Sequence, residues 1–285
     1  PIEKGAEVYS NGVATDTGKH PNRCAHQNLV QIGVSLEAVA THDARYRAPR
    51  ARMAIHAYSM ARHRRVTPVT DTKVFRGLTQ DELDAQYDQN TFVGNLAPYL
   101  EQWGELTDKA MAQYAVQRDV RYGDQPNQRM DYFSAGVADA PLVLFFHGGA
   151  WMRHTKAMFG YPALAFVANG YAFATVEFDV VPNVGLDEQI NHGLLAFEWL
   201  VTNAEGFDFD PSRVFVSGHH SGALLAGMVA TTDWTERLKS ESSPLAGALL
   251  LSGVYDLEPV RLSSRNEQLG LSTKQARSLS PIHPI

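Results

Sequence analysis

Four apolar runs, separated by segments of helical or turn character, constrain the fold of this 285-residue chain more than any other feature. The runs are PLVLFFHGG (141–149), YAFATVEFDVV (171–181), RVFVSGHH (213–220) and LAGALLLSGVYD (245–256). A strand that is apolar along its whole length is typical of a parallel sheet covered on both faces. Helical spacing between the runs predicts that helices form the crossover connections. We therefore predict an α/β fold with a mostly parallel sheet and helices on both faces.

An antiparallel pair is expected ahead of the parallel strands. Residues 114–123 and 128–135 alternate apolar and polar side chains on either side of a turn, as half-buried hairpin strands do. Among the crossover helices, those over 186–202 and 221–231 have the clearest apolar patterns.

A capping box marks the start of a further helical region upstream of the sheet. Thr79 is a suitable N-cap, and Glu82 follows three residues later, where its carboxylate can return to the N-cap backbone. One or two helices are predicted from here to about Gln113.

Composition narrows the class of protein. With 44% apolar residues the chain can bury a full core, and no stretch reaches the roughly 18 consecutive apolar residues of a membrane-spanning helix. The single cysteine, Cys24, excludes an internal disulfide and a Cys-based zinc site. The net charge of -6 gives no argument for a nucleic-acid partner. We expect a cytoplasmic protein without a membrane or nucleic-acid partner.

A basic segment near the N-terminus suggests a domain boundary. Between Asp43 and Lys73 there are eight Lys or Arg and two Asp, whereas the rest of the chain is acidic on balance. Such a segment could contact a membrane surface or nucleic acid, or resemble a transit sequence, but its apolar positions form no clean stripe. We therefore interpret residues 1–74 as a solvated extension and residues 75–285 as the folded domain.

The chemistry is expected where the parallel strands end, because ligands bind at the carboxyl ends of strands in such sheets. His147 to Trp151 read HGGAW, and two glycines there let backbone N–H groups approach a developing oxyanion. Ser217 to Gly222 read SGHHSG, a turn with the glycine spacing of a nucleophile elbow, in which Gly218 and Gly222 relieve crowding around a strained central residue. After the last strand, GVYDLEPV supplies Asp256 and Glu258.

These motifs together resemble the bacterial kynurenine formamidases (arylformamidases) and related esterases of the α/β-hydrolase fold. The similarity rests on HGGAW, RVFVSGHHSGALLAGMVATTDW, LSGVYDLEPVRLSSRNEQLG and SLSPI, and it extends to GLTQDELDAQYDQN and the hairpin, so it covers about residues 75–285. It implies hydrolysis of N-formylkynurenine or of small aryl esters and amides, without a metal or cofactor. It also implies that Gly148, Gly149 and Ala150 form an oxyanion loop to which Ser221 adds its backbone N–H.

The central residue of the elbow departs from the family pattern. The family has Gly-His-Ser-Ser-Gly or Gly-His-Ser-Ala-Gly, so His220 occupies the position of the nucleophilic serine. Ser221 is an alternative nucleophile, although His219 would then crowd the elbow. An imidazole can itself attack an activated ester, but slowly, because an acyl-imidazole intermediate gains little. We predict that His147, His219 and Trp151 support the site rather than react, with the two histidines holding the loop and the elbow by hydrogen bonds.

The C-terminal part departs as well. In this fold the acid and the base of a triad follow the nucleophile on later loops. Relative to the family, the sequence ending at Ile285 lacks the last strand–helix units, so we expect no counterpart of either residue. Asp256 is the candidate substitute for the acid, and His283 is interpreted as structural.

Three functional hypotheses remain. The chain is a hydrolase of the arylformamidase or esterase type with an altered nucleophile, acting on a small aromatic amide or ester. Alternatively, it is a non-catalytic descendant that binds a small aromatic ligand or a protein partner. In the third hypothesis it is a cofactor-free enzyme that uses His220 with Asp256 as a general base. The sequence does not indicate an oligomeric state, and a homo-oligomer is compatible with it.

Overall fold

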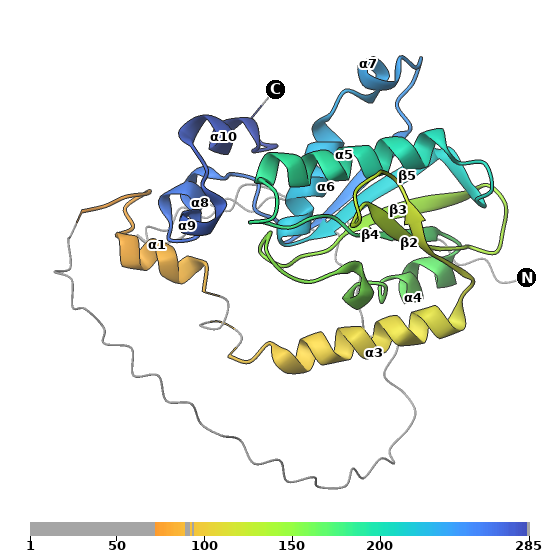
Figure 1. Ribbon diagram of the computed structural model, residues 1–285, viewed down its shortest axis with the longest axis horizontal. Helices are drawn as coiled ribbons and strands as arrows, with labels where there is room; N and C mark the ends of the chain where they lie inside the picture. The colour runs from red at the N-terminus through yellow and green to blue at the C-terminus, as the bar shows by residue number, and fades with distance from the viewer. Residues whose placement is uncertain (1–71, 89–91, 93, 284–285) are drawn as a thin grey trace, which may run out of the picture. The chain divides into compact units, whose positions relative to one another are not determined.

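The computed structural model describes residues 72–88, 92 and 94–283 (Figure 1). All of them belong to one compact unit, Val66–Ile285. Of the predicted extension only residues 72–74 are described, so Cys24 and most of the basic segment lie outside the described residues.

The described part alternates strands and helices after an initial helical region. The strands are β1 (Val116–Arg121), β2 (Arg129–Phe133), β3 (Ala140–Phe146), β4 (Ala172–Val176), β5 (Phe209–His219) and β6 (Leu245–Leu251). The helices are α1 (Gln80–Gln86), α3 (Ala97–Gln113), η1 (Lys156–Met158), α4 (Ala163–Phe166), η2 (Val167–Asn169), α5 (Leu186–Thr202), α6 (Ser221–Thr231), α7 (Trp234–Leu238), α8 (Glu258–Leu262), α9 (Asn266–Leu269) and α10 (Thr273–Ser278). Among the described residues no helix is both long and apolar enough to cross a membrane.

The six strands form one sheet in the order β1-β2-β4-β3-β5-β6. β1 and β2 pair antiparallel, β2 also pairs antiparallel with β4, and the remaining neighbours are parallel. This confirms the predicted mostly parallel sheet preceded by a hairpin. Two strands are shorter than the apolar runs that predicted them, since β4 ends at Val176 and β6 ends at Leu251.

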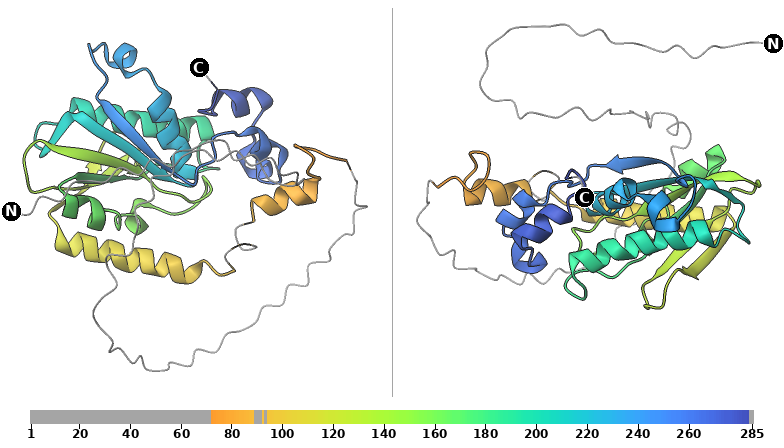
Figure 2. Two further views of the ribbon diagram at one scale, coloured as in Figure 1. Left: turned by 180° about the vertical axis from the view of Figure 1, so that it is seen from behind. Right: turned by 90° about the horizontal axis from the view of Figure 1, so that it is seen from above.

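Helices cover both faces of the sheet, as Figures 1 and 2 show. Successive residues of a strand point to opposite faces. Leu144 and Phe146 accordingly belong to the larger core, which also includes buried side chains of α5 and α6. Val143 and Phe145 belong to a second cluster on the side of α3 and α4. Both faces are therefore apolar, which explains the uninterrupted hydrophobic character of β3.

The capping box predicted at Thr79 is present. The Thr79 hydroxyl accepts from the Glu82 backbone N–H, and the Glu82 carboxylate accepts from the Thr79 N–H at 2.7 Å. These bonds satisfy backbone donors that α1 itself leaves unpaired. α1 is tied to the C-terminal helices, because Asp84 accepts from the Ser264 N–H at 2.7 Å.

Candidate functional site

The register of β3 and β5 brings the two glycine-containing motifs together. Phe146, the last residue of β3, pairs with Gly218 near the end of β5. The chain therefore leaves both strands at the same edge of the sheet. As a result, the loop that begins at His147 lies beside the turn at His219 and His220. A Cβ atom added to Gly148 would lie 3.0 Å from the carbonyl oxygen of His219.

His220 adopts a strained backbone conformation at the turn between β5 and α6, the position predicted as the elbow. Its backbone angles are φ 55° and ψ -118°, at the start of α6. A non-glycine residue in such a region costs about 1–3 kcal/mol and persists only where its surroundings hold it. Here the His220 N–H donates to the Leu251 carbonyl at 2.9 Å, and its own carbonyl accepts from the Ala223 N–H at 3.1 Å.

The two elbow glycines are required by close backbone approach. A Cβ atom at Gly218 would lie 2.3 Å from the carbonyl oxygen of Gly222. A Cβ atom at Gly222 would lie 2.2 Å from the carbonyl oxygen of Phe146. Any side chain at either position would force backbone atoms apart, so the geometry accounts for the spacing of glycines seen in the sequence.

The loop after β3 offers backbone donors to the same space. Gly149 has φ 140°, and a Cβ atom there would lie 1.9 Å from the Arg153 carbonyl oxygen, so only glycine fits. Within the described residues, the N–H groups of Gly149 and Ala150 donate to no acceptor. Ser221 is the first residue of α6, where the helix provides no i−4 carbonyl for its N–H. This donor arrangement suits a developing oxyanion.

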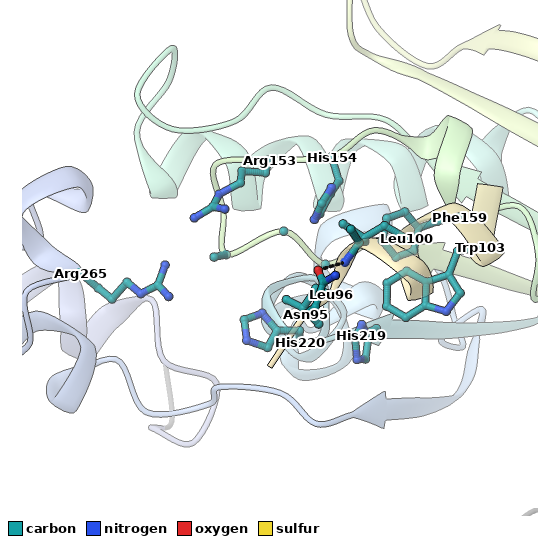
Figure 3. A pocket seen from close by; sticks show the side chains of 14 residues that line it. Asn95, Leu96, Leu100, Trp103, Arg153, His154, Phe159, His219, His220 and Arg265 are labelled. Atoms are coloured by element: carbon teal, nitrogen blue, oxygen red, sulfur yellow. Dashed lines mark hydrogen bonds between the residues drawn. The ribbon is translucent and has the colours of Figure 1, made fainter. Parts of the chain in front are cut away.

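A cavity of about 320 Å³ lies against the loop 148–150 and the turn at His219 and His220 (Figure 3). This volume is near the lower end of the range for small-molecule sites. The residues that line the cavity are Asn95, Leu96, Ala97, Leu100, Trp103, Gly148, Gly149, Ala150, Arg153, His154, Phe159, His219, His220 and Arg265. Trp103 contributes an aromatic wall, with its ring centroid 5.5 Å from that of Phe159 and 6.1 Å from that of His219.

The histidines of the cavity are held in the neutral form. Burial, with smaller contributions from the neighbouring His219 and Arg265, lowers the pKa of His220 to about 4. Burial also lowers the pKa of His219. Burial lowers the pKa of His154, with smaller contributions from His147 and Arg153. Near pH 7 the His220 imidazole is therefore uncharged and a weaker base than an ordinary histidine.

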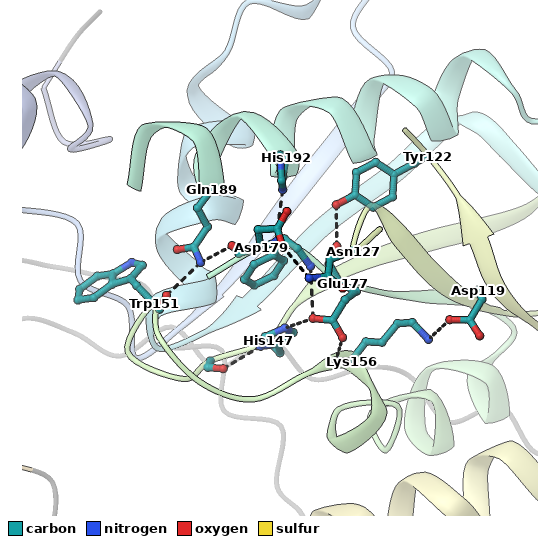
Figure 4. A network of polar contacts seen from close by, with 12 residues as sticks. Asp119, Tyr122, Asn127, His147, Trp151, Lys156, Glu177, Asp179, Gln189 and His192 are labelled. Carbon is teal, nitrogen blue, oxygen red and sulfur yellow. Dashed lines mark hydrogen bonds and ion pairs between the residues drawn. The ribbon is translucent and has the colours of Figure 1, made fainter. Parts of the chain in front are cut away.

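His147 lies beneath the loop in a buried polar network (Figure 4). Its Nδ1 lies 2.8 Å from the Gly148 carbonyl oxygen, and because a carbonyl only accepts, Nδ1 carries the hydrogen. Its Nε2 lies 3.5 Å from Glu177 Oε1, and its ring stacks on Phe178 with centroids 4.3 Å apart. Glu177 also accepts from the Lys156 N–H at 3.0 Å. Both ends of the loop are thus tied to the residue that follows β4.

The other residues predicted for the site have different surroundings. The Trp151 side chain is buried, and its carbonyl accepts from Gln189 Nε2 at 3.2 Å. His219 contacts the Trp103 ring edge-on, and within the described residues its imidazole makes no hydrogen bond, so the predicted bond to the elbow is absent. Ser221 is buried and does not line the cavity.

Asp256 and His283 lie away from the cavity lining. The Asp256 carboxylate accepts from the Glu258 N–H at 2.9 Å, which fixes the start of α8. The groups that shift the pKa of His220 do not include Asp256. The His283 N–H donates to the Ser280 carbonyl at 3.0 Å. The structure therefore brings the loop 148–150 and the turn at His220 together, where the sequence predicted an oxyanion loop and an elbow, but does not bring Asp256 into the cavity.

Several cavity residues were not predicted from the sequence, among them Trp103, Arg153, His154 and Arg265. Trp103 comes from α3, Arg153 and His154 from the loop after β3, and Arg265 precedes α9. The run HGGAWMRH offered a local signal for the middle two, whereas only tertiary packing brings the others to the site. In the described part of the chain, no group of three or more His, Cys, Asp or Glu residues could hold a metal ion.

Comparison with known proteins places this geometry among hydrolases. Residues 132–251 match the BD-FAE family. The chain is 28% identical over 218 residues to the kynurenine formamidase of Danio rerio, covering 73% of this chain and 71% of the relative. It is also 28% identical over 149 residues to the isoprenylcysteine alpha-carbonyl methylesterase ICME of Arabidopsis thaliana, covering 50% of this chain and 35% of the relative.

Solved structures give the same fold. A crystal structure from Silicibacter sp. tm1040 superposes with a TM-score of 0.61 at 23% identity and covers 70% of this chain and 74% of its own. Esterase B of Lactobacillus rhamnosis superposes with a TM-score of 0.52 at 17% identity and covers 68% of this chain and 71% of its own. Together with the sheet order, these matches identify an α/β-hydrolase fold.

Proposed function

We propose that this chain, which carries a BD-FAE domain in an α/β-hydrolase fold, is a protein of the arylformamidase and esterase kind. Its cavity binds a small aromatic amide or ester. Within it, Gly149, Ala150 and Ser221 provide the oxyanion donors. His220 stands at the nucleophile position without supplying an efficient nucleophile.

One observation carries this proposal. His220, with φ 55° and ψ -118°, lies between two glycines that admit no side chain and faces the same cavity as the loop 148–150. A strained residue that is held so tightly at a cavity indicates a site selected for geometry rather than for packing. The kynurenine formamidase and esterase relatives support the reaction class, namely attack at a carbonyl carbon.

The chemistry open to His220 is limited. Its imidazole is neutral at pH 7, so it can attack the carbonyl carbon of an activated acyl group, expel the alcohol or amine, which takes up a proton, and lose its own N–H proton to water. The resulting acyl-imidazole is hydrolysed by water to the acid and free imidazole. The lowered pKa makes it a weak nucleophile, because nucleophilicity falls with basicity. Backbone donors remain available to the carbonyl oxygen of a bound ligand. Binding should therefore be retained more fully than turnover.

A non-catalytic binding role is the second candidate, and the presence of His220 where the family has serine favours it. The third hypothesis, a His220–Asp256 general base, has less support. Asp256 is engaged with the backbone of α8 and does not line the cavity.

Binding of formanilide, the smallest aryl formamide, tests whether the cavity is the ligand site. Titration calorimetry on the full chain is expected to detect binding that Leu100→Trp abolishes, because the larger side chain fills the cavity. Tyr99→Trp is the matched control, since Tyr99 is 50% exposed on α3 and does not line the cavity. Equal binding by both variants, or none by the unmodified chain in the millimolar range, would contradict the proposal.

A further inference from the structure

We propose that the cavity selects ligands that carry a carboxylate, which Arg153 and Arg265 bind together at one end. This inference rests on the proposed function, because it assumes that the cavity is the ligand site. It names a substrate class that the fold alone does not specify: anionic aryl amides or esters.

The first argument is the distribution of charge. None of the described residues that line the cavity is an Asp or a Glu, whereas two are arginines. Neither Arg153 nor Arg265 forms an ion pair with a carboxylate of the described residues. Arginine side chains at ligand cavities are suited to planar, bidentate recognition of carboxylates. The cavity therefore presents two guanidinium groups without a compensating negative charge in its described lining.

The second argument is that Arg265 is already held in place. One of its N–H groups donates to the Tyr87 carbonyl at 2.5 Å, at the end of α1. Because a guanidinium has five N–H donors in a fixed plane, the others stay available. Arg265 also acts electrostatically on His220, so its charge reaches the elbow. The Arg265 side chain therefore loses little further conformational entropy when a ligand binds to it.

The third argument is the position of the apolar wall. Figure 3 shows Trp103, Leu100 and Phe159 on one side of the cavity and Arg153 and Arg265 on the other, with His220 between them. An aromatic ring packed on Trp103 would place a carboxylate substituent toward the arginines. The acyl group would then lie near the oxyanion donors. This arrangement fits an aryl ring that carries both groups.

The positive charge at the arginine end of the cavity does not depend on the histidines. The pKa values of His154, His219 and His220 are all lowered, so near pH 7 these side chains are neutral. The positive charge of the cavity therefore comes from the two arginines, whose guanidinium groups stay protonated.

Anthranilate and its neutral isostere anthranilamide test the proposal by titration calorimetry on the full chain. Because such hydrogen bonds are charge-assisted, the affinity for anthranilate should exceed that for anthranilamide by about tenfold or more. Arg153→Gln and Arg265→Gln are each expected to remove most of that preference while leaving anthranilamide binding unchanged. Arg265→Lys keeps the charge but not the planar guanidinium group that can donate two parallel hydrogen bonds. It provides a second variant if Arg265→Gln fails to fold. Arg213→Gln is the matched control, because Arg213 is exposed on β5 and does not line the cavity.

The outcomes separate this inference from the proposed function. Equal affinity for the two ligands, or a preference that persists in either glutamine variant, overturns the paired carboxylate site and leaves the cavity intact as a ligand site. Loss of the preference in the Arg213 variant also overturns it, because the effect would then be one of overall charge. If neither ligand binds, both the inference and the proposed function are contradicted.

Discussion

The carbonyl oxygen of Phe146 lies over Gly222 so closely that a Cβ atom at position 222 would be 2.2 Å from it. The end of β3 and the first turn of α6 are therefore locked against each other at the base of the site. This contact fixes the distance between the oxyanion loop and the elbow.

Gly222→Ala should destabilise the protein by about 3 kcal/mol or more, because the obstructing atom is backbone and cannot rotate away. Gly104→Ala in α3 is the matched control. A Cβ atom there meets nothing within 4 Å, and alanine favours a helix by up to about 1 kcal/mol. Urea unfolding of both variants checks the pair. If Gly222→Ala left the free energy of unfolding unchanged, β3 and α6 would be able to separate.

Lys156→Met should cost about 3–5 kcal/mol of unfolding free energy, because it leaves the Asp131 carboxylate buried without its cation. The Lys156 ammonium lies 2.6 Å from Asp131 Oδ1, and both side chains are buried. Lys73→Met removes an exposed pair with Glu82, whose atoms are 3.4 Å apart, and should change the unfolding free energy little, because water screens exposed pairs. Similar losses in the two variants, measured by urea unfolding, would contradict the burial argument.

The stability of the protein should fall in acid because of His220. Its pKa is about 4 in the folded protein against an ordinary value of 6.5, so between these values the unfolded chain binds the proton and the folded chain does not. The contribution of His220 to the free energy of unfolding is therefore fully present above pH 6.5 and is lost as the pH falls toward 4. Near pH 5 the loss due to this residue is about 2 kcal/mol.

His220→Asn removes the titration while keeping a residue that tolerates positive φ. The difference in unfolding free energy between the variant and the unmodified chain should grow in favour of the variant from about pH 6.5 downward. His219 and His154 titrate in both proteins and cancel in this comparison. A constant difference would mean that His220 is more accessible to water than its surroundings indicate.

The predicted boundary of the folded domain leads to a truncation experiment. The two apolar core clusters of the described residues are built from side chains between Tyr87 and Leu279. We therefore propose that residues 1–71 add little to stability, and we expect a chain that begins at Thr72 to keep its melting temperature. A large fall in melting temperature on truncation would assign a structural role to the removed segment.

The parts of the fold that follow local rules could be predicted from the sequence. The helix bounds 186–202 and 221–231 and the capping box at Thr79 agree with the structure, because apolar spacing and caps depend on neighbouring residues. The strand ends were less accurate. β4 ends just before Glu177, whose carboxylate accepts from the Lys156 backbone N–H and lies near His147, and no local pattern records such contacts.

The candidate site was predictable only where glycines mark it. Gly148, Gly149, Gly218 and Gly222 are forced by close backbone approach, and this constraint is visible in the sequence. By contrast, Arg265 reaches the cavity from a segment that is more than a hundred residues from the oxyanion loop. The lowered pKa of His220 likewise arises from burial, which depends on the packed structure.

Hydrolysis of p-nitrophenyl acetate and N-formylkynurenine by the unmodified chain tests the central claim most directly, namely that His220 holds the nucleophile position without supplying an efficient nucleophile. Loss of a catalytic serine costs on the order of a million-fold in turnover, so both rates should lie close to those in buffer. His220→Ala should then change them little. Turnover of either substrate at about 10 per second, abolished by His220→Ala, would contradict the account and make His220 a working catalytic residue.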